Sequence, residues 1–251
     1  RPEKTMSDPL VYTTPRAPRS VNLNVLKVVA VVSMVIDHVH FIGFDRQWSP
    51  VTVMGLAALP LFCFLLTYNY LFHSRNRARY IARLCAFVVI SQWPYQWAFE
   101  RPTFPLNLNI FASLAAGLLI IHFFESIRFK GHRVVLWVVT TFCLVLEYVS
   151  GEAYSTFLDG GFSGLLLMPA LFFLFQRHRL VSLSGAVLVA FALWILDGSN
   201  CGWSIGTVAF AYYLSGFIPL ELGWMRRAKW FFYVFYPAHL VLIRAVFLWL
   251  R

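Results

Sequence analysis

The sequence is short of charge. Only 13% of its 251 residues are Asp, Glu, Lys or Arg, where soluble proteins average about a quarter, and 59% are hydrophobic. Acidic residues are scarcer than basic ones: the chain has 11 Asp and Glu and 21 Lys and Arg, which gives a formal net charge of +10. So little charge excludes a soluble enzyme and a disordered tail, because neither is so apolar, and it indicates a membrane protein.

Long stretches contain no charged residue, and two further apolar stretches contain only one or two. A bilayer core of roughly 30 Å takes about 17–25 helical residues, so most of these stretches are long enough to span it. The candidate spans are residues 23–44, 47–74, 84–99, 102–124, 134–146, 160–176, 180–196, 198–220 and 230–250. We therefore predict an all-α polytopic integral membrane protein with about nine transmembrane helices. The fifth span is the shortest even if it extends to residue 149, and if it is only re-entrant, all later segments change side.

Lys and Arg are unevenly distributed between these spans. Alternate segments hold 16 of the 21: Arg1, Lys4, Arg16, Arg19, Arg75, Arg77, Arg79, Arg83, Arg128, Lys130, Arg133, Arg177, Arg179, Arg226, Arg227 and Lys229. Cytoplasmic loops carry the Lys and Arg excess, which predicts a cytoplasmic N-terminus and an extracytoplasmic C-terminus in a multi-pass protein of the bacterial inner membrane. The positive charge thus reflects topology and membrane lipids as partners, and we expect no nucleic acid partner.

Paired cysteine spacing and a packed N-terminal segment are also missing. Cys63, Cys85, Cys143 and Cys201 are interpreted as small buried hydrophobic residues rather than as disulfides or metal ligands, which excludes a secreted disulfide scaffold.

Residues 1–22 contain four prolines and mixed charge, and they are expected to form a flexible cytoplasmic segment. Met6 is a candidate natural start, which would make residues 1–5 an added remnant. Residues 23–251 are expected to form a single helical membrane domain.

The ionisable residues Lys27, Asp37 and His38 lie in the first span. Such groups are costly at membrane depth and are therefore functional candidates. Lys27 and His38 are eleven residues apart, which places them within about 20° on one helix face and roughly 16 Å apart along the axis. One ligand could contact both, or Lys27 could extend to the interface while His38 makes a structural hydrogen bond. Asp37 does not share the face of His38 and is better placed for Ser33, His40 or a cation on another helix.

The last span also contains a histidine. His239 lies near mid-bilayer, and Tyr236, three residues earlier, shares its face. If the first and last helices start level, the two histidines differ in depth by about two turns, which leaves their contact open. A lone histidine in a span is more often structural. Pro237 removes a backbone donor and could open room for a ligand by a kink, and Arg244 is expected to anchor the outer interface.

Arginines cluster after the second span, at Arg75, Arg77 and Arg79. They could bind the phosphates of coenzyme A or anionic lipid head groups. No metal-ligand spacing joins the histidines, so we expect no metal. The chain also contains no Gly-rich phosphate loop and no Gly-x-Ser-x-Gly elbow.

Four motifs, in order, resemble the TraX family of conjugation systems, whose members N-acetylate pilin. They are residues 23–27 with 36–38, residues 58–66, residues 159–166 and residues 232–240. The first and last are the most specific, and the resemblance covers nearly all of residues 22–250. Within the family the chain looks like the TrbP-like members, in whose systems pilin can be cyclised instead. It departs from the family where many members carry an Arg and this chain has Leu56.

The resemblance implies an acetyl-CoA-dependent N-acetyltransferase that modifies the N-terminal amine of a pilin subunit in conjugative pilin maturation. His38 would be the general base, Lys27 with Arg75 and Arg79 would bind acetyl-CoA, and Tyr236 or His239 would hydrogen-bond the thioester oxygen. Asp37 is a further catalytic candidate. Two alternatives remain open: a non-enzymatic pilin maturation or assembly factor, and a membrane acyltransferase acting on a lipid or glycan.

Overall fold

The structure is a computed structural model, and it describes residues 23–44, 54–55, 57–100, 107–126, 167–169, 171–172 and 230–250. Every regular element in this part of the chain is an α-helix. The expected spans at residues 134–146, 180–196 and 198–220 lie outside the described residues, as do the N-terminal segment and the motif at residues 159–166.

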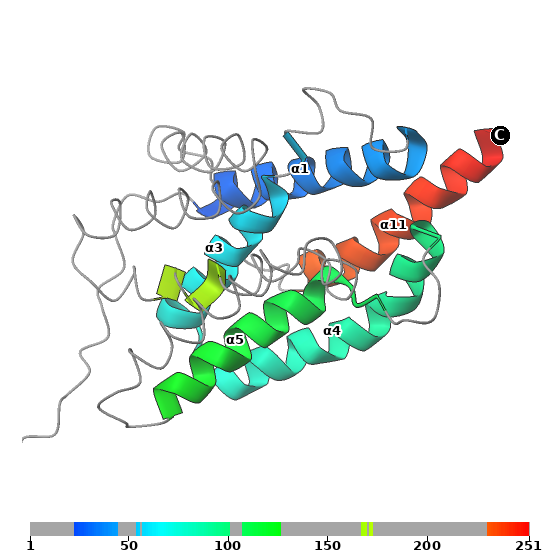
Figure 1. Ribbon diagram of the computed structural model, residues 1–251. Helices are drawn as coiled ribbons and strands as arrows, with labels where there is room; N and C mark the ends of the chain where they lie inside the picture. Colours follow the sequence, from blue (N-terminus) through cyan, green and yellow to red (C-terminus); the bar gives the residue numbers. More distant parts are fainter. Residues whose placement is uncertain are drawn as a thin grey trace, which may run out of the picture.

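Five helices are described, and each corresponds to a predicted span. They are α1 (Leu23–Phe44), α3 (Ala58–Phe72), α4 (Arg77–Ala98), α5 (Ile110–Ser126) and α11 (Phe231–Leu250) (Figure 1). α1 and α11 agree with the prediction almost to the residue. α4 differs most, because it begins seven residues before the uncharged stretch, so that Arg77, Arg79 and Arg83 lie on its first turns and not in a loop.

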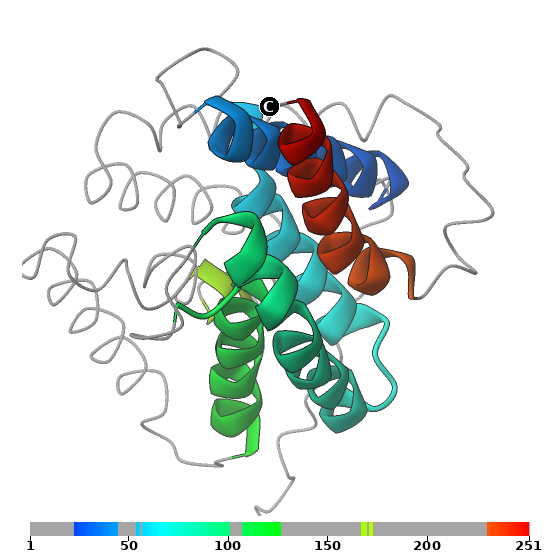
Figure 2. The ribbon, with the colours of Figure 1, turned by 90° about the vertical axis from the view of Figure 1, so that its right-hand side faces the viewer.

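The helices pack in a closed order, with α1 against α3, α3 against α5, α5 against α4, α4 against α11 and α11 against α1. Figure 2 shows α1 and α11 crossing in the upper half of the view, with α4 and α5 side by side below. α1 and α11 are parallel, because Lys27 near the start of α1 lies over the ring of Phe232, and Phe44 at its end contacts Phe247.

The remaining contacts fix the other directions. Arg77 at the start of α4 pairs with Glu125 at the end of α5, so these two helices are antiparallel. α1, α4 and α11 therefore begin where α3 and α5 end. We call this the basic end of the bundle, defined by Lys27, Arg77, Arg79 and Arg83. The relative directions are those that alternation along the predicted spans requires.

Buried side chains from all five helices form one apolar core. The fully buried members with the largest side chains include Leu26, Leu61, Tyr70, Leu84 and Leu118, with Leu240 from the last helix. A short described stretch at residues 167–169 adds Met168, which has no exposed surface. Of the two described cysteines, Cys63 is buried as expected, whereas Cys85 is exposed on α4, and both are free thiols.

Two asparagines start helices. The side chain of Asn76 accepts a hydrogen bond from the backbone N–H of Arg79 (2.9 Å), which caps α4. Asn109 is completely buried, and its Oδ1 accepts from the N–H of Phe111 (3.0 Å) at the start of α5. Its amide also donates to Gln92 and to the Val88 carbonyl, which joins α5 to the middle of α4.

Two of the described helices, α1 and α11, are long and apolar enough to cross a membrane, whereas α3 and α5 are apolar but shorter. The lengths and compositions of α1 and α11 are the basis for this. They agree with the prediction of a membrane protein.

Candidate functional site

The structure brings His38 of α1 and His239 of α11 together, although they are 201 residues apart in sequence. His38 Nδ1 and His239 Nε2 are 2.6 Å apart, and the two rings are nearly parallel at 13°. Their exposed fractions are 8% and 5%, so the pair is shielded from solvent. The sequence singled out both residues but left their contact open.

The depths of the two histidines agree because the helices do not start level. Lys27, four residues into α1, lies over Phe232, the second residue of α11. α1 therefore begins almost a turn before α11. This offset removes part of the expected difference in depth, and the crossing of the two helices brings the rings into contact.

The hydrogen bonds of the pair define which ring nitrogens carry protons. His239 Nδ1 lies 2.8 Å from the carbonyl oxygen of Phe235, and a carbonyl only accepts, so Nδ1 is the donor. In a neutral imidazole the other nitrogen then accepts, and His38 must donate its Nδ1–H to His239 Nε2. A neutral His38 therefore has its lone pair on Nε2, which is the nitrogen that can take a proton.

Aromatic rings surround the pair. The Phe99 ring lies edge-on to His38, with centroids 5.3 Å apart, and the Phe235 ring stacks on His239 at 5.0 Å. Tyr236 is 2% exposed and contacts both histidine rings edge-on, at 6.0 Å from His38 and 5.7 Å from His239. Its phenol therefore belongs to the same site, as the shared helix face predicted.

Asp37 lies at a very close approach between backbones. A Cβ built on Gly55 would come within 2.7 Å of Asp37 Cβ and 2.8 Å of its Cα, so only glycine fits there. Asp37 is half-buried and points to a different side of α1 from His38. Gly55 was not expected to matter, and its role is to let the chain approach α1 beside the histidine.

Lys27 lies at the basic end, on the same helix as His38. Its ammonium is 5.9 Å from the centroid of the Phe232 ring. It is also close enough to His73, which directly follows α3, for its charge to act there: partial burial first, and then the charge of Lys27, lower the pKa of His73. Lys27 therefore lies where α1 begins and α3 ends.

The three clustered arginines have different environments. Arg75 and Arg79 are exposed. Arg77 is half-buried: its Nη1 pairs with Glu125 Oε2 at 2.7 Å, and its guanidinium lies over the Tyr70 ring at 4.9 Å. Arg77 therefore has a structural role that the sequence did not indicate, and the two arginines named as phosphate ligands are the accessible ones.

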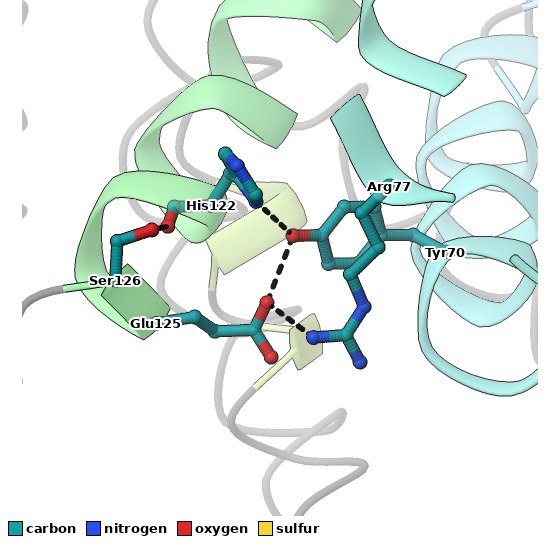
Figure 3. A network of polar contacts seen from close by, with 5 residues as sticks. All are labelled: Tyr70, Arg77, His122, Glu125 and Ser126. Atoms are coloured by element: carbon teal, nitrogen blue, oxygen red, sulfur yellow. Dashed lines mark hydrogen bonds and ion pairs between the residues drawn. The ribbon is translucent and has the colours of Figure 1, made fainter. Parts of the chain in front are cut away.

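Glu125 belongs to a network that we call the Tyr70 cluster, made of Tyr70, Arg77, His122 and Glu125 (Figure 3). The Tyr70 hydroxyl donates to Glu125 Oε2 (2.8 Å) and lies 3.0 Å from His122 Nδ1. Since the single hydroxyl proton goes to Glu125, His122 Nδ1 is the donor in the second bond. The cluster joins α3, α4 and α5 at the basic end.

Arg244 differs from expectation. It is 9% exposed, and its Nη2 pairs with a carboxylate oxygen of Glu100, which follows the end of α4. It is therefore a buried partner in an ion pair between helices and not an interface anchor. Sequence alone gave no signal for this pairing, because acidic residues outside the spans read as ordinary loop charges.

Comparison with known proteins gives two matches that cover most of the chain. Residues 22–247 match the family described as TraX protein. The chain is also 26% identical over 242 residues to a protein of Dichelobacter nodosus named "Probable fimbrial assembly protein FimC, serogroup H1", covering 87% of this chain and 92% of that protein. No solved structure matches. Because the family match extends from before α1 almost to the end of α11 and includes both histidines, the chain belongs to the TraX protein family.

Proposed function

We propose that the protein is a membrane-embedded acetyltransferase of pilin maturation, which moves an acetyl group from acetyl-CoA to the N-terminal amine of a pilin subunit. The observation that carries the proposal is the buried hydrogen bond between His38 and His239. Membership of the TraX family supports a role in pilin maturation, and the name of the fimbrial relative supports a role in pilus assembly.

His38 Nε2 is the general base. As the neutral amine nitrogen attacks the thioester carbonyl carbon, Nε2 takes a proton from it, and the C–S bond then breaks. The same proton passes from His38 to the departing thiolate, so amine and thioester become amide and thiol with no proton left over. An α-amino group has a reference pKa of about 7.7–8, so a useful fraction of the acceptor is neutral near pH 7.

His239 supports this step indirectly. Both of its ring nitrogens are engaged, one by Phe235 and one by His38, so it orients His38 and accepts from the Nδ1–H of the imidazolium when that ring is charged. Tyr236 remains for the thioester oxygen, to which its hydroxyl would donate as negative charge develops there. Asp37 lies on another side of α1, at the close approach of Gly55, and the proposal gives it no step in the reaction.

The donor enters from the basic end. Lys27, about 16 Å from His38 along α1, would hold a phosphate of acetyl-CoA, and the exposed Arg75 and Arg79 would contact its remaining phosphates. The distance suits an extended pantetheine arm, which places the thioester near His38. Arg77 is not part of this set, because Glu125 holds it.

The same proposal includes the membrane arrangement. About nine helices cross the bacterial inner membrane, the N-terminus is cytoplasmic, and the C-terminus is extracytoplasmic. The parallel directions of α1 and α11 support an odd number of crossings. The pilin subunit, itself hydrophobic, would reach the site laterally through lipid.

The rival function is a non-enzymatic assembly factor, which the name of the fimbrial relative favours. In that case the histidine pair only specifies the packing of α1 on α11. Mass spectrometry of mature pilin separates the two functions, in cells that carry the wild-type protein, the His38→Ala variant or no protein. The enzyme predicts one additional acetyl group on pilin with the wild-type protein only. Unmodified pilin in all three strains would refute the transferase, and an acetylated lipid or glycan would identify another acceptor.

A further inference from the structure

Arg244 is the one Lys, Arg, Asp or Glu in helix α11. Charged side chains within spans are costly and need a partner. Its side chain is 11% exposed, whereas that of Glu100, its partner, is 65% exposed. The Glu100 carboxylate therefore reaches from an open position at the end of α4 to a buried guanidinium on α11.

The backbone at Glu100 is unusual. Its φ is +51°, and it is the one residue other than glycine with positive φ in the part of the chain that the structure describes. A residue one position beyond a helix C-cap often adopts this left-handed conformation, but glycine is the usual choice because a Cβ is unfavourable there. A glutamate at this place indicates that its side chain is needed.

The residue before Glu100 connects the ion pair to the candidate site. Phe99 is the C-cap of α4, and its ring lies edge-on to His38 and to Phe41, at 5.3 Å and 4.9 Å. On the other side of the pair, Arg244 follows His239 by five residues on α11. The ends of α4 and α11 lie close together on the right of Figure 1, with the end of α1.

We infer that the Glu100–Arg244 ion pair is a positioning element for the two histidines. It fixes the end of α4 against α11, so that the Phe99 ring holds His38 in hydrogen-bonding geometry with His239. Neither residue contacts the reacting atoms. The inference rests on the proposed function for its kinetic consequence, but its structural consequence does not depend on it.

Three variants test the inference: Glu100→Gln, Glu100→Gly and, as a matched control, Glu125→Gln. The control breaks the other described ion pair between helices, at the opposite end of the bundle. Because a small misplacement of a catalytic group can cost about 100-fold, we expect both Glu100 variants to lower kcat by about 10- to 100-fold with KM unchanged. The control should keep its kcat.

Glu100→Gly is the decisive variant. Glycine adopts the positive φ of this position without a Cβ penalty, and the substitution also removes the carboxylate. A wild-type kcat for this variant would show that residue 100 only needs to form a turn, and it would overturn the inference. Equal losses of kcat in the Glu125 control would also overturn it, as a general effect of destabilisation. If the Glu100 variants do not fold, Phe99→Ala removes the ring instead, and a wild-type kcat there would equally refute the inference.

A second readout separates this inference from the proposed function. Nitrogen NMR of the imidazoles in labelled protein reports which ring nitrogens carry protons. The hydrogen-bonded pattern of His38 and His239 should be present in the wild type and in Glu125→Gln and lost in Glu100→Gln. Suppose that neither the wild type nor any variant transfers acetyl, but the imidazole pattern still differs between the wild type and Glu100→Gln. The proposed transferase activity is then refuted, and the positioning role of the ion pair is supported. An unchanged pattern in Glu100→Gln would refute the positioning element.

Discussion

The Tyr70 cluster at the basic end and the histidine pair farther along α1 and α11 differ in the chemistry of the groups that they join. At the basic end, the Tyr70 cluster is built on an ion pair: Arg77 pairs with Glu125, Tyr70 donates to Glu125, and His122 donates to Tyr70. The histidine pair joins two imidazoles, which are 8% and 5% exposed and lie among aromatic rings.

This difference indicates which group is built for chemistry. A polar network whose donors and carboxylate satisfy one another stabilises the packing of the helices that it joins. Two hydrogen-bonded imidazoles can accept a proton and share its charge. Burial of a titratable residue therefore does not by itself identify a catalytic site, and the chemistry of the groups bonded to it has to be considered as well.

The largest expected effect is all-or-none and concerns which side of the membrane each end faces. A reporter fused after Arg251 should read as extracytoplasmic, and one inserted near Arg128 should read as cytoplasmic, because 16 of 21 Lys and Arg fall in alternate segments. Alkaline phosphatase and fluorescent protein fusions measure this. If both reporters give the same side, the fifth span or a later one does not cross.

Replacing His38 by alanine should nearly abolish acetyl transfer, by at least about 100-fold in kcat, because a general base contributes about 10²- to 10⁴-fold. Helix content and membrane insertion should remain, since only one buried polar contact is lost. His40→Ala, two residues away on the same helix, is the control and should keep its activity. Wild-type transfer by His38→Ala would make the pair structural, like the Tyr70 cluster.

Lys27 tests whether the basic end also takes part in the reaction. Lys27→Met should chiefly raise KM for acetyl-CoA, by roughly 10- to 150-fold, since a lost hydrogen bond between charged groups costs about 1.5–3 kcal/mol. Lys27→Arg keeps the charge and should retain much of the affinity. Titration of acetyl-CoA into purified protein in detergent measures both. Equal dissociation constants for wild type and Lys27→Met would remove Lys27 from the donor site.

The smallest effect on activity is expected in the Tyr70 cluster. Tyr70→Phe removes the hydroxyl that joins Glu125 and His122, and we expect a loss of about 1.5–3 kcal/mol in the free energy of unfolding with kcat unchanged. Thermal unfolding in detergent and steady-state kinetics check the two parts. Ser126→Ala, whose exposed hydroxyl bonds only to a carbonyl one turn away in α5, is the control and should cost less than about 0.5 kcal/mol. A selective fall in kcat for Tyr70→Phe would show that the basic end does more than hold helices.

Much of the described architecture follows from local patterns. The apolar runs predicted where the first and last helices lie, and the scarcity of charge within them marked Lys27, Asp37 and His38 as unusual. The start of α4 was missed, because its first turns carry arginines and arginine is a good helix former outside the apolar layer. Arg244 was misinterpreted for a related reason, since a cation near a helix end looks the same in sequence whether it faces lipid head groups or a carboxylate.

By itself the sequence determined the helices and the face on which each polar residue lies, because helical hydrogen bonds join residues four apart and depend on the local segment alone. Only the tertiary structure decided that His38 meets His239, that Arg77 is held by Glu125, and that Glu100 reaches Arg244. These contacts join segments 48, 144 and 201 residues apart. Their existence depends on which helices pack together and at what offset, and that is set by the fit of side chains between helices rather than by any pattern within one.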